Sequence, residues 1–168
     1  VDLNEEGLAS LVAELGDENL ATVRCDLAES DAAGSIIDVA TERFGGIDGL
    51  FHAAAMLRRQ YDINSVTVAD FDAQVAVNQR ATWFLTRDIC EHQQASGRRG
   101  SVVLFSSLGA FTGGLGGSWV YAATKGAVLT MVRGFAKQYA ASGIRVNAIS
   151  PGTVDTPMLT DDLEDGQL

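Results

Sequence analysis

Apolar residues along the chain form two patterns: short uninterrupted runs, and longer segments in which they recur at helical spacing. The short runs predict strands over residues 20–25, 47–53, 101–107 and 144–149. The longer segments predict helices over residues 5–15, 26–44, 67–94 and 118–141. Strands that alternate with helices of this length form βαβ units. The pattern therefore predicts a single α/β domain over residues 1–168, built on a mostly parallel sheet.

The run SVVLFSS at residues 101–107 is almost wholly apolar, which is typical of a strand buried on both faces. Polar residues or small residues follow the ends of the predicted strands. These positions are occupied by Asp26, residues 52–55, Ser106, Ser107 and residues 151–156. Because the carboxyl ends of parallel strands meet at one edge of a sheet, where α/β proteins bind ligands, we expect one site there.

Tyr121 and Lys125 follow this edge on the next predicted helix, one turn apart. Residues at positions i and i+4 lie on the same helix face, so the phenol and the ammonium group can meet. A tyrosine has a reference pKa of about 10, and a neighbouring cation favours the phenolate and lowers that value. If the pair is catalytic, Tyr121 transfers a proton and Lys125 adjusts the pKa of Tyr121. Taken alone, such a pair is more often part of an exposed helix surface than of a functional site.

Composition narrows the function classes. Hydrophobic residues make up 46% of the chain and charged residues 20%, the balance of an ordinary globular protein. The net charge of −10, without a cluster of Lys and Arg, argues against nucleic acid as a partner. No apolar run is long enough for a membrane span. Cys25 and Cys90 lie far apart and indicate neither a disulfide framework nor a zinc site, which favours the cytoplasm.

Together, these residues resemble the short-chain dehydrogenase/reductase family over residues 2–158. Tyr121 and Lys125 match its YxxxK motif, and PGTVDTPM matches its nicotinamide-side segment. The four residues that match its catalytic set are Asn78, Ser107, Tyr121 and Lys125. The resemblance implies a Rossmann-like, doubly wound parallel sheet and an oxidoreductase that moves a hydride between NAD(H) and a secondary alcohol or ketone.

The resemblance also implies a role for each catalytic match. Tyr121 is the expected general acid/base, and Lys125 is expected to hold the nicotinamide ribose and lower the Tyr121 pKa. Ser107 is expected to hydrogen-bond the substrate oxygen, and Asn78 to anchor a water that relays protons. Without the resemblance, Asn78 could simply bond a local backbone carbonyl.

Cofactor contacts are implied in the same way. Asp2 matches the acidic residue that accepts the adenosine ribose hydroxyls and repels a 2′-phosphate, which favours NAD over NADP. Asp26 matches an adenine contact, although both aspartates could instead be helix N-caps. HAAA replaces the family's NNAG at residues 52–55. The remaining expected cofactor contacts are Ala53, Ala54, Tyr121, Lys125, Pro151, Gly152, Val154 and Thr156.

The family's glycine-rich TGxxxGxG turn does not occur in these 168 residues. We therefore expect the sheet to lack the first strand, most of the second and the C-terminal strand of the family. An alternative interpretation is a catalytically silent fragment or pseudoenzyme that cannot bind dinucleotide without a preceding segment. Another is an epimerase or dehydratase of nucleotide sugars, in which Tyr and Lys serve a different reaction.

Three further expectations concern the rest of the chain. The family suggests a homodimer or homotetramer built on the helices at 67–94 and 118–141. His52 invites a catalytic or metal-binding role, but no second ligand accompanies it, so we expect a packed, hydrogen-bonded histidine. The acids from Asp161 to Asp165 are typical of a solvated tail.

Overall fold

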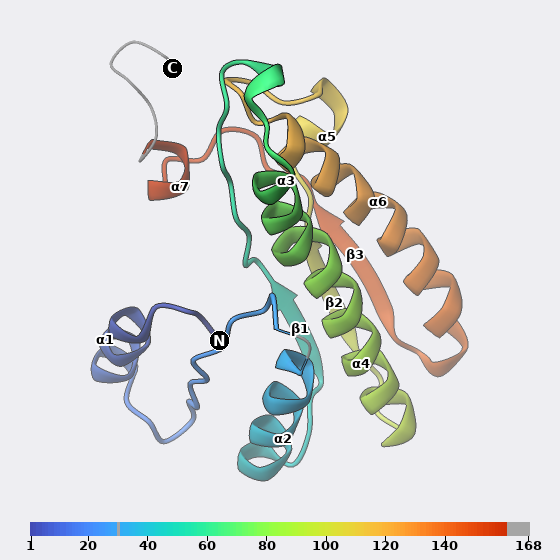
Figure 1. Cartoon of the computed structure of the whole chain (residues 1–168). Coiled ribbons are helices and arrows are strands. Elements are labelled where there is room, and N and C mark those ends of the chain that lie inside the picture. The colour runs from blue at the N-terminus through green and yellow to red at the C-terminus, as the bar shows by residue number, and fades with distance from the viewer. Residues whose placement is uncertain (30, 161–168) are drawn as a thin grey trace.

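The computed structural model describes residues 1–29 and 31–160, and it contains a three-stranded parallel sheet with helices along one face (Figure 1). The strands are β1 (Gly49–His52), β2 (Ser101–Phe105) and β3 (Arg145–Ile149), in the order β1-β2-β3. In the register of the sheet, Leu50 lies beside Val102 and Val102 beside Val146. The fold is therefore α/β and Rossmann-like, as the alternation of strands and helices predicts.

The long helices occupy the predicted segments. They are α1 (Glu5–Leu15), α2 (Ala32–Phe44), α3 (Val68–Val75), α4 (Thr82–Ala95) and α6 (Trp119–Tyr139). A π-helical stretch, η2 (Ala76–Ala81), joins α3 to α4 without interruption. The short helices are η1 (Ile63–Ser65), α5 (Gly109–Thr112), η3 (Ala140–Ser142) and α7 (Pro157–Thr160). The predicted acidic tail lies outside the described residues, and none of the described helices has the length and apolar character that a membrane crossing requires.

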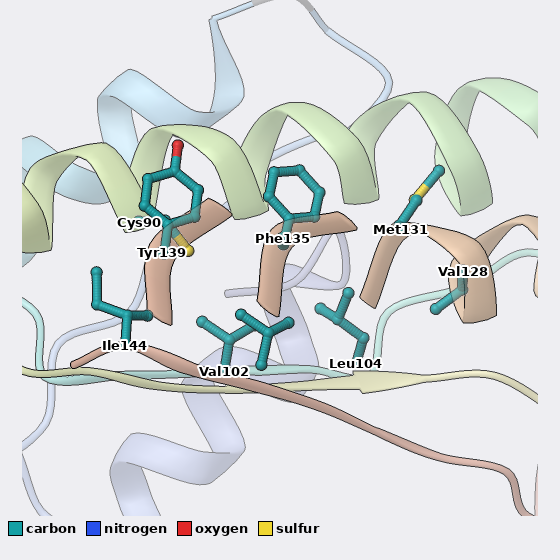
Figure 2. Packing of buried hydrophobic residues seen from close by; sticks show 9 residues of the cluster. Cys90, Val102, Leu104, Val128, Met131, Phe135, Tyr139 and Ile144 are labelled. Atoms are coloured by element: carbon teal, nitrogen blue, oxygen red, sulfur yellow. The ribbon is translucent and has the colours of Figure 1, made fainter. Parts of the chain in front are cut away.

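The main core lies between the sheet and the helices α4 and α6. Val102 and Leu104 of β2 are fully buried. Figure 2 shows them pointing toward α6, which contributes four side chains to the same cluster. Those side chains are Val128, Met131, Phe135 and Tyr139. Burying an aliphatic or aromatic side chain of this size stabilises a fold by about 1.5–3 kcal/mol. This packing anchors α6, and with it the turn that carries Tyr121, to the strand that ends at the serine pair.

A second cluster packs α2 against α4, and it contains Ala33 of α2, Ile47 from the loop after α2, and Leu85 and Ile89 of α4. The helices α2, α4 and α6 thus lie on the same face of the sheet (Figure 1). The opposite face is more open, since Phe51 is 67% exposed and its ring partner Phe105 is half-buried. The prediction that the 101–107 strand is buried on both faces is therefore wrong for the described residues.

Residues 20–25, predicted as a strand, form only an isolated parallel bridge between Asp2 and Arg24. Asp2 N–H donates to Val23 O at 3.2 Å, and Cys25 N–H donates to Asp2 O at 3.0 Å. An extended segment becomes a strand only where a neighbour offers consecutive backbone groups. Asp2 alone provides that contact, and α1 begins directly afterwards. The sheet of the described residues accordingly has β1 at its edge.

Candidate active site

A cavity of about 340 Å³ opens beside the carboxyl ends of β2 and β3. Its walls come from the loop after β1, the loop after β2, the start of α6 and the segment after β3. It gathers most of the residues that the sequence singles out. These are Ala53, Ser107, Tyr121, Lys125, Pro151, Gly152, Val154 and Thr156. Four expected site residues do not line it, namely Asp2, Asp26, Ala54 and Asn78.

The two serines after β2, Ser106 and Ser107, form different hydrogen bonds. The Ser106 hydroxyl is buried and donates to the backbone carbonyl of Lys125 at 2.8 Å, which ties the end of β2 to α6. Ser107 Oγ accepts a hydrogen bond from Gly109 N–H at 3.0 Å, at the start of α5. The Ser107 side chain also acts on the Tyr121 phenol as a hydrogen-bonding group that lowers the pKa of the phenol. Ser107 is thus the serine that influences the phenol.

Lys125 is buried, and its Nζ donates to the backbone carbonyl of Phe105 at 2.8 Å. Burial lowers the pKa of its ammonium group to about 8. The Lys125 Nζ atom lies 5.5 Å from the centre of the Tyr121 ring, so the two side chains do meet across one turn of α6.

The expected lowering of the Tyr121 pKa by Lys125 is not found. Burial raises the pKa of Tyr121 above its usual value, and the hydrogen-bonding effect of Ser107 only partly opposes this. The physical reason is that burial disfavours the phenolate, while the ammonium group of Lys125 bonds the backbone carbonyl of Phe105 and lies over the Tyr121 ring. In this arrangement Tyr121 is a protonated phenol that can donate a hydrogen bond or a proton.

Asn78 lies behind the cavity, fully buried in the π-helical turn η2. Its Oδ1 accepts from Met56 N–H at 2.7 Å, and its Nδ2 donates to Met56 O at 2.7 Å. The same Nδ2 donates to Thr124 Oγ1 at 3.2 Å. The side chain therefore bonds backbone groups, but those of Met56, which are not local in the sequence, and it clamps η2 to the loop after β1. Single π-helical turns are frequent at functional sites.

His52 closes β1 and is buried, with Nε2 at 3.0 Å from the hydroxyl of Thr82. Burial, and to a smaller extent the charge of Lys125, lower the pKa of the imidazole to about 4. This is the packed, hydrogen-bonded histidine that the sequence predicts. The described residues contain no cluster of three or more His, Cys, Asp or Glu side chains that could hold a metal ion.

Asp2 and Asp26 each accept a hydrogen bond from a backbone N–H two residues later, at 2.9 Å. Neither is a helix N-cap, so that alternative is wrong. The cap of α1 is Asn4, whose side chain accepts from Gly7 N–H, and α2 begins only after Asp31. Both carboxylates form turns before the helices start, because a bond to the second following residue favours a turn over a helix.

The cavity has a further wall that sequence patterns do not identify. Leu57, Arg59, Leu108, Leu115 and Met158 line it from loops and from the short helix α7. Gln60 N–H donates to Gly117 O at 3.1 Å and holds two of these loops together. Loop residues have no periodic spacing, so only the glycine-rich composition of residues 113–117 signals that the backbone passes close to another segment there.

We expect Gly117→Ala to destabilise this wall. Gly117 has a φ of +76°, and an added Cβ would lie 2.3 Å from the carbonyl oxygen of Gln60. Gly113→Ala is the matched control, since Gly113 has a φ of +85° but no atom within 4 Å of the added Cβ. Both variants carry the cost of a left-handed alanine, about 1 kcal/mol, and overpacking adds roughly 1–3 kcal/mol for Gly117→Ala only. Denaturant unfolding of both variants measures the difference, and equal losses would contradict the prediction.

Comparison with known proteins places this geometry in a family. A family model described as "Enoyl-(Acyl carrier protein) reductase" matches residues 1–167. Levodione reductase of Leifsonia aquatica is 33% identical, over 98% of this chain and 62% of its own length. A crystal structure described as "Short-chain dehydrogenase/reductase SDR:Glucose/ribitol dehydrogenase" from Brucella melitensis is 32% identical, with a TM-score of 0.86. That alignment covers 95% of this chain and 63% of the solved one.

The chain belongs to the short-chain dehydrogenase/reductase family. It spans a little over three fifths of the length of the curated relative and of the Brucella structure. A further structure, described as "ElxO with NADP Bound", shares the fold with a TM-score of 0.85 at 24% identity, over 99% of this chain and 67% of that one. The matched region of this short-chain dehydrogenase/reductase includes the whole cavity from Ala53 to Met158.

Proposed function

We propose that the protein containing this chain is an oxidoreductase that interconverts a secondary alcohol and a ketone with NAD(H). The observation that carries the proposal is the cavity beside β2 and β3, in which Ser107, Tyr121 and Lys125 converge. A phenol whose pKa is influenced by a serine hydroxyl in the same cavity, with a buried amine one helical turn away, is suited to exchanging a proton with a substrate oxygen.

Tyr121 is the proposed general acid/base. Burial holds it in the protonated form, so in the direction of ketone reduction it donates its proton to the forming alkoxide oxygen. Ser107 is proposed to hydrogen-bond that same oxygen, because its hydroxyl already lies beside the phenol. A hydrogen-bond donor placed where charge develops stabilises the transition state. We also propose that Asn78 holds the loop after β1 and α6 in place through its bonds to Met56 and Thr124. As the family suggests, it is further proposed to anchor a water that relays protons.

The residues around the cavity fit the nicotinamide end of a dinucleotide. The small side chains of Ala53 and Gly152 leave open space at the cavity wall, and the site offers the Lys125 amine and the Thr156 hydroxyl as polar groups. Ala54, Pro151 and Val154 are further proposed contacts on that side. When bound there, a nicotinamide supplies the hydride that the protein's own side chains cannot supply.

NAD is the proposed form of the cofactor, with NADP less favoured. Asp2 is exposed, and its Oδ1 accepts a hydrogen bond from Asn4 N–H at 2.9 Å. A carboxylate there is suited to accepting ribose hydroxyls and to repelling a 2′-phosphate. ElxO is described as NADP-bound, but at 24% identity its likeness to this chain concerns the fold only. Asp26, half-buried before α2, is the proposed adenine contact.

We expect Asp2→Ser in the full-length protein to raise the relative preference for NADP by about 10- to 100-fold, because it removes a like-charge repulsion worth about one to three kcal/mol. The ratio of kcat/KM for NADP to that for NAD measures the effect. Asp17→Ser, which removes another exposed carboxylate from the same region, is the matched control and should leave the ratio unchanged. An unchanged ratio in Asp2→Ser would contradict the proposed contact.

The proposed function is tested by incubating the full-length protein with NAD and a panel of secondary alcohols while following the absorbance of reduced nicotinamide. Oxidation of at least one alcohol that also depends on Tyr121 supports the proposal. The silent-fragment interpretation predicts no turnover and no dinucleotide binding by the same protein. Release of a rearranged or dehydrated nucleotide sugar without net change in nicotinamide would instead favour the epimerase or dehydratase interpretation.

A homodimer or homotetramer stays a proposal, which sedimentation of the full-length protein tests.

A further inference from the structure

A continuous chain of hydrogen bonds connects the end of β1 to the turn that holds Asn78. His52 Nε2 lies 3.0 Å from Thr82 Oγ1, and Thr82 Oγ1 lies 2.8 Å from the backbone carbonyl oxygen of Asn78. All three residues are buried. Thr82 is the first residue of α4, directly after the π-helical turn. A threonine that bonds the carbonyl four residues earlier bends a helix, which suits this position.

The direction of these bonds follows from the groups themselves. A backbone carbonyl can only accept, so the single hydrogen of the Thr82 hydroxyl is directed to Asn78 O. The Thr82 oxygen then offers only lone pairs to His52. The imidazole must therefore donate, and its hydrogen lies on Nε2.

The other side of Asn78 continues the chain to α6. Its amide Nδ2 donates to Thr124 Oγ1, and the Thr124 hydroxyl donates to the backbone carbonyl of Tyr121 at 2.7 Å. Thr124 is buried and precedes Lys125. The position of Asn78 is thus linked on one side to His52 and on the other to the first turn of α6, which carries the proposed acid/base.

We propose that His52 is a positioning residue of the active site: by donating from Nε2 to Thr82, it orients the hydroxyl that holds Asn78 and, through Thr124, the turn of Tyr121. The proposal rests on the proposed function in one respect, namely that Tyr121, the residue being positioned, is the general acid/base. It assigns to His52 a task beyond packing, although His52 does not line the cavity.

The surroundings of His52 keep the imidazole neutral in this role. It is buried at the end of β1, and the charged group that acts on it is the ammonium of Lys125. Both influences lower its pKa, to about 4. Near neutral pH the ring is therefore a neutral hydrogen-bond donor. A glutamine side chain, whose amide is also an uncharged donor, should therefore be able to take its place beside Thr82. His52 is accordingly not proposed to exchange protons with the substrate.

The first test is spectroscopic and does not depend on turnover. In the full-length protein labelled with nitrogen-15, the imidazole signals of His52 are expected to show the neutral tautomer with hydrogen on Nε2 at pH 7. A His92→Gln variant identifies the signals of the other histidine in this chain. Thr82→Val, which removes the hydroxyl with little change of shape, is expected to shift the tautomer equilibrium of His52. Hydrogen on Nδ1, or a tautomer unaffected by Thr82→Val, would overturn the proposal.

The second test is kinetic. His52→Leu and Thr82→Val are each expected to lower kcat about tenfold with KM for the alcohol changed less than about threefold, the scale of one buried hydrogen bond. The double variant should lose little more than either single variant, because both interrupt one chain. His52→Gln, which retains an N–H donor, should recover most of kcat, and His92→Gln should leave it unchanged. Additive losses, or equal losses in His52→Leu and His52→Gln, would overturn the positioning role.

The two tests separate this inference from the proposed function. An Nε2 tautomer that responds to Thr82→Val, in a protein that oxidises no alcohol, would support the hydrogen-bond chain while contradicting the proposed reaction. Turnover that depends on Tyr121 but is insensitive to both His52→Leu and Thr82→Val would support the reaction and overturn the role of His52. If His52→Leu does not fold, the comparison of Thr82→Val with Thr82→Ser, which keeps the hydroxyl, decides the kinetic test in its place.

Discussion

Tyr121→Phe is expected to lower kcat for alcohol oxidation by about 10²- to 10⁴-fold, the usual contribution of a general acid/base. The substitution removes one hydroxyl and keeps the ring that packs at the start of α6. Ser107 keeps the hydrogen bond from Gly109 N–H, so the loop after β2 should stay in place. Dissociation constants for NAD, measured by fluorescence titration, should change less than about threefold because the phenol acts on the substrate oxygen.

Tyr139→Phe provides the matched control on the same helix. Tyr139 is buried in the core beside Phe135, far along α6 from the cavity, and does not line it. Its kcat should equal that of the unchanged protein. Turnover retained in Tyr121→Phe, or lost to the same extent in Tyr139→Phe, would contradict the assignment of Tyr121. A fall in NAD affinity comparable with the fall in kcat would instead indicate a binding role.

Lys125→Met is expected to lower kcat by about 10²-fold or more and to remove one ionisation from the pH profile. Burial lowers the pKa of Lys125 to about 8, so the ammonium is charged below that pH and loses its proton as the pH rises through it. The cation is proposed to hold the ribose and to stabilise negative charge near Tyr121. The kcat/KM of the unchanged protein for ketone reduction should therefore fall as the pH rises above about 8.

The pH profile of Lys125→Met should lack this fall, since methionine cannot titrate. Lys137→Met is the control, because Lys137 is the other lysine of the chain and is exposed on the same helix. Its profile should match that of the unchanged protein. Persistence of the decline near pH 8 in Lys125→Met would mean that another group titrates there. Thermal unfolding of both variants at neutral pH shows whether any loss of turnover comes from loss of the fold.

Sequence patterns predict the elements that local spacing specifies. The predicted helix at residues 5–15 forms as α1 and the predicted strand at 144–149 forms as β3. The spacing does not decide how deeply they are buried, since Leu8 is the only buried residue of α1 and Leu15 is exposed. The segment 20–25 has the same strand-like composition but forms one bridge only. Composition reports what a segment favours, whereas pairing depends on which neighbour lies beside it.

In the candidate site, too, the sequence identifies some features and not others. Tyr121, Lys125 and Ser107 are identified by motif, and the parallel sheet brings them to one edge because strand ends converge there. The partners of these groups are not in any motif. The Lys125 amine bonds Phe105 O, and Asn78 bonds both backbone groups of Met56, contacts that depend on how loops and helices pack.

By itself, the sequence determined the α/β class, the order of the elements and the residue types at the catalytic edge, since each follows from local spacing and from motifs. The tertiary structure alone decided the state of those residues. Burial raised the Tyr121 pKa and lowered that of Lys125, where the spacing of the pair predicted the opposite for the tyrosine. Spacing places two side chains on one face, but desolvation and hydrogen-bond direction depend on atoms from distant segments.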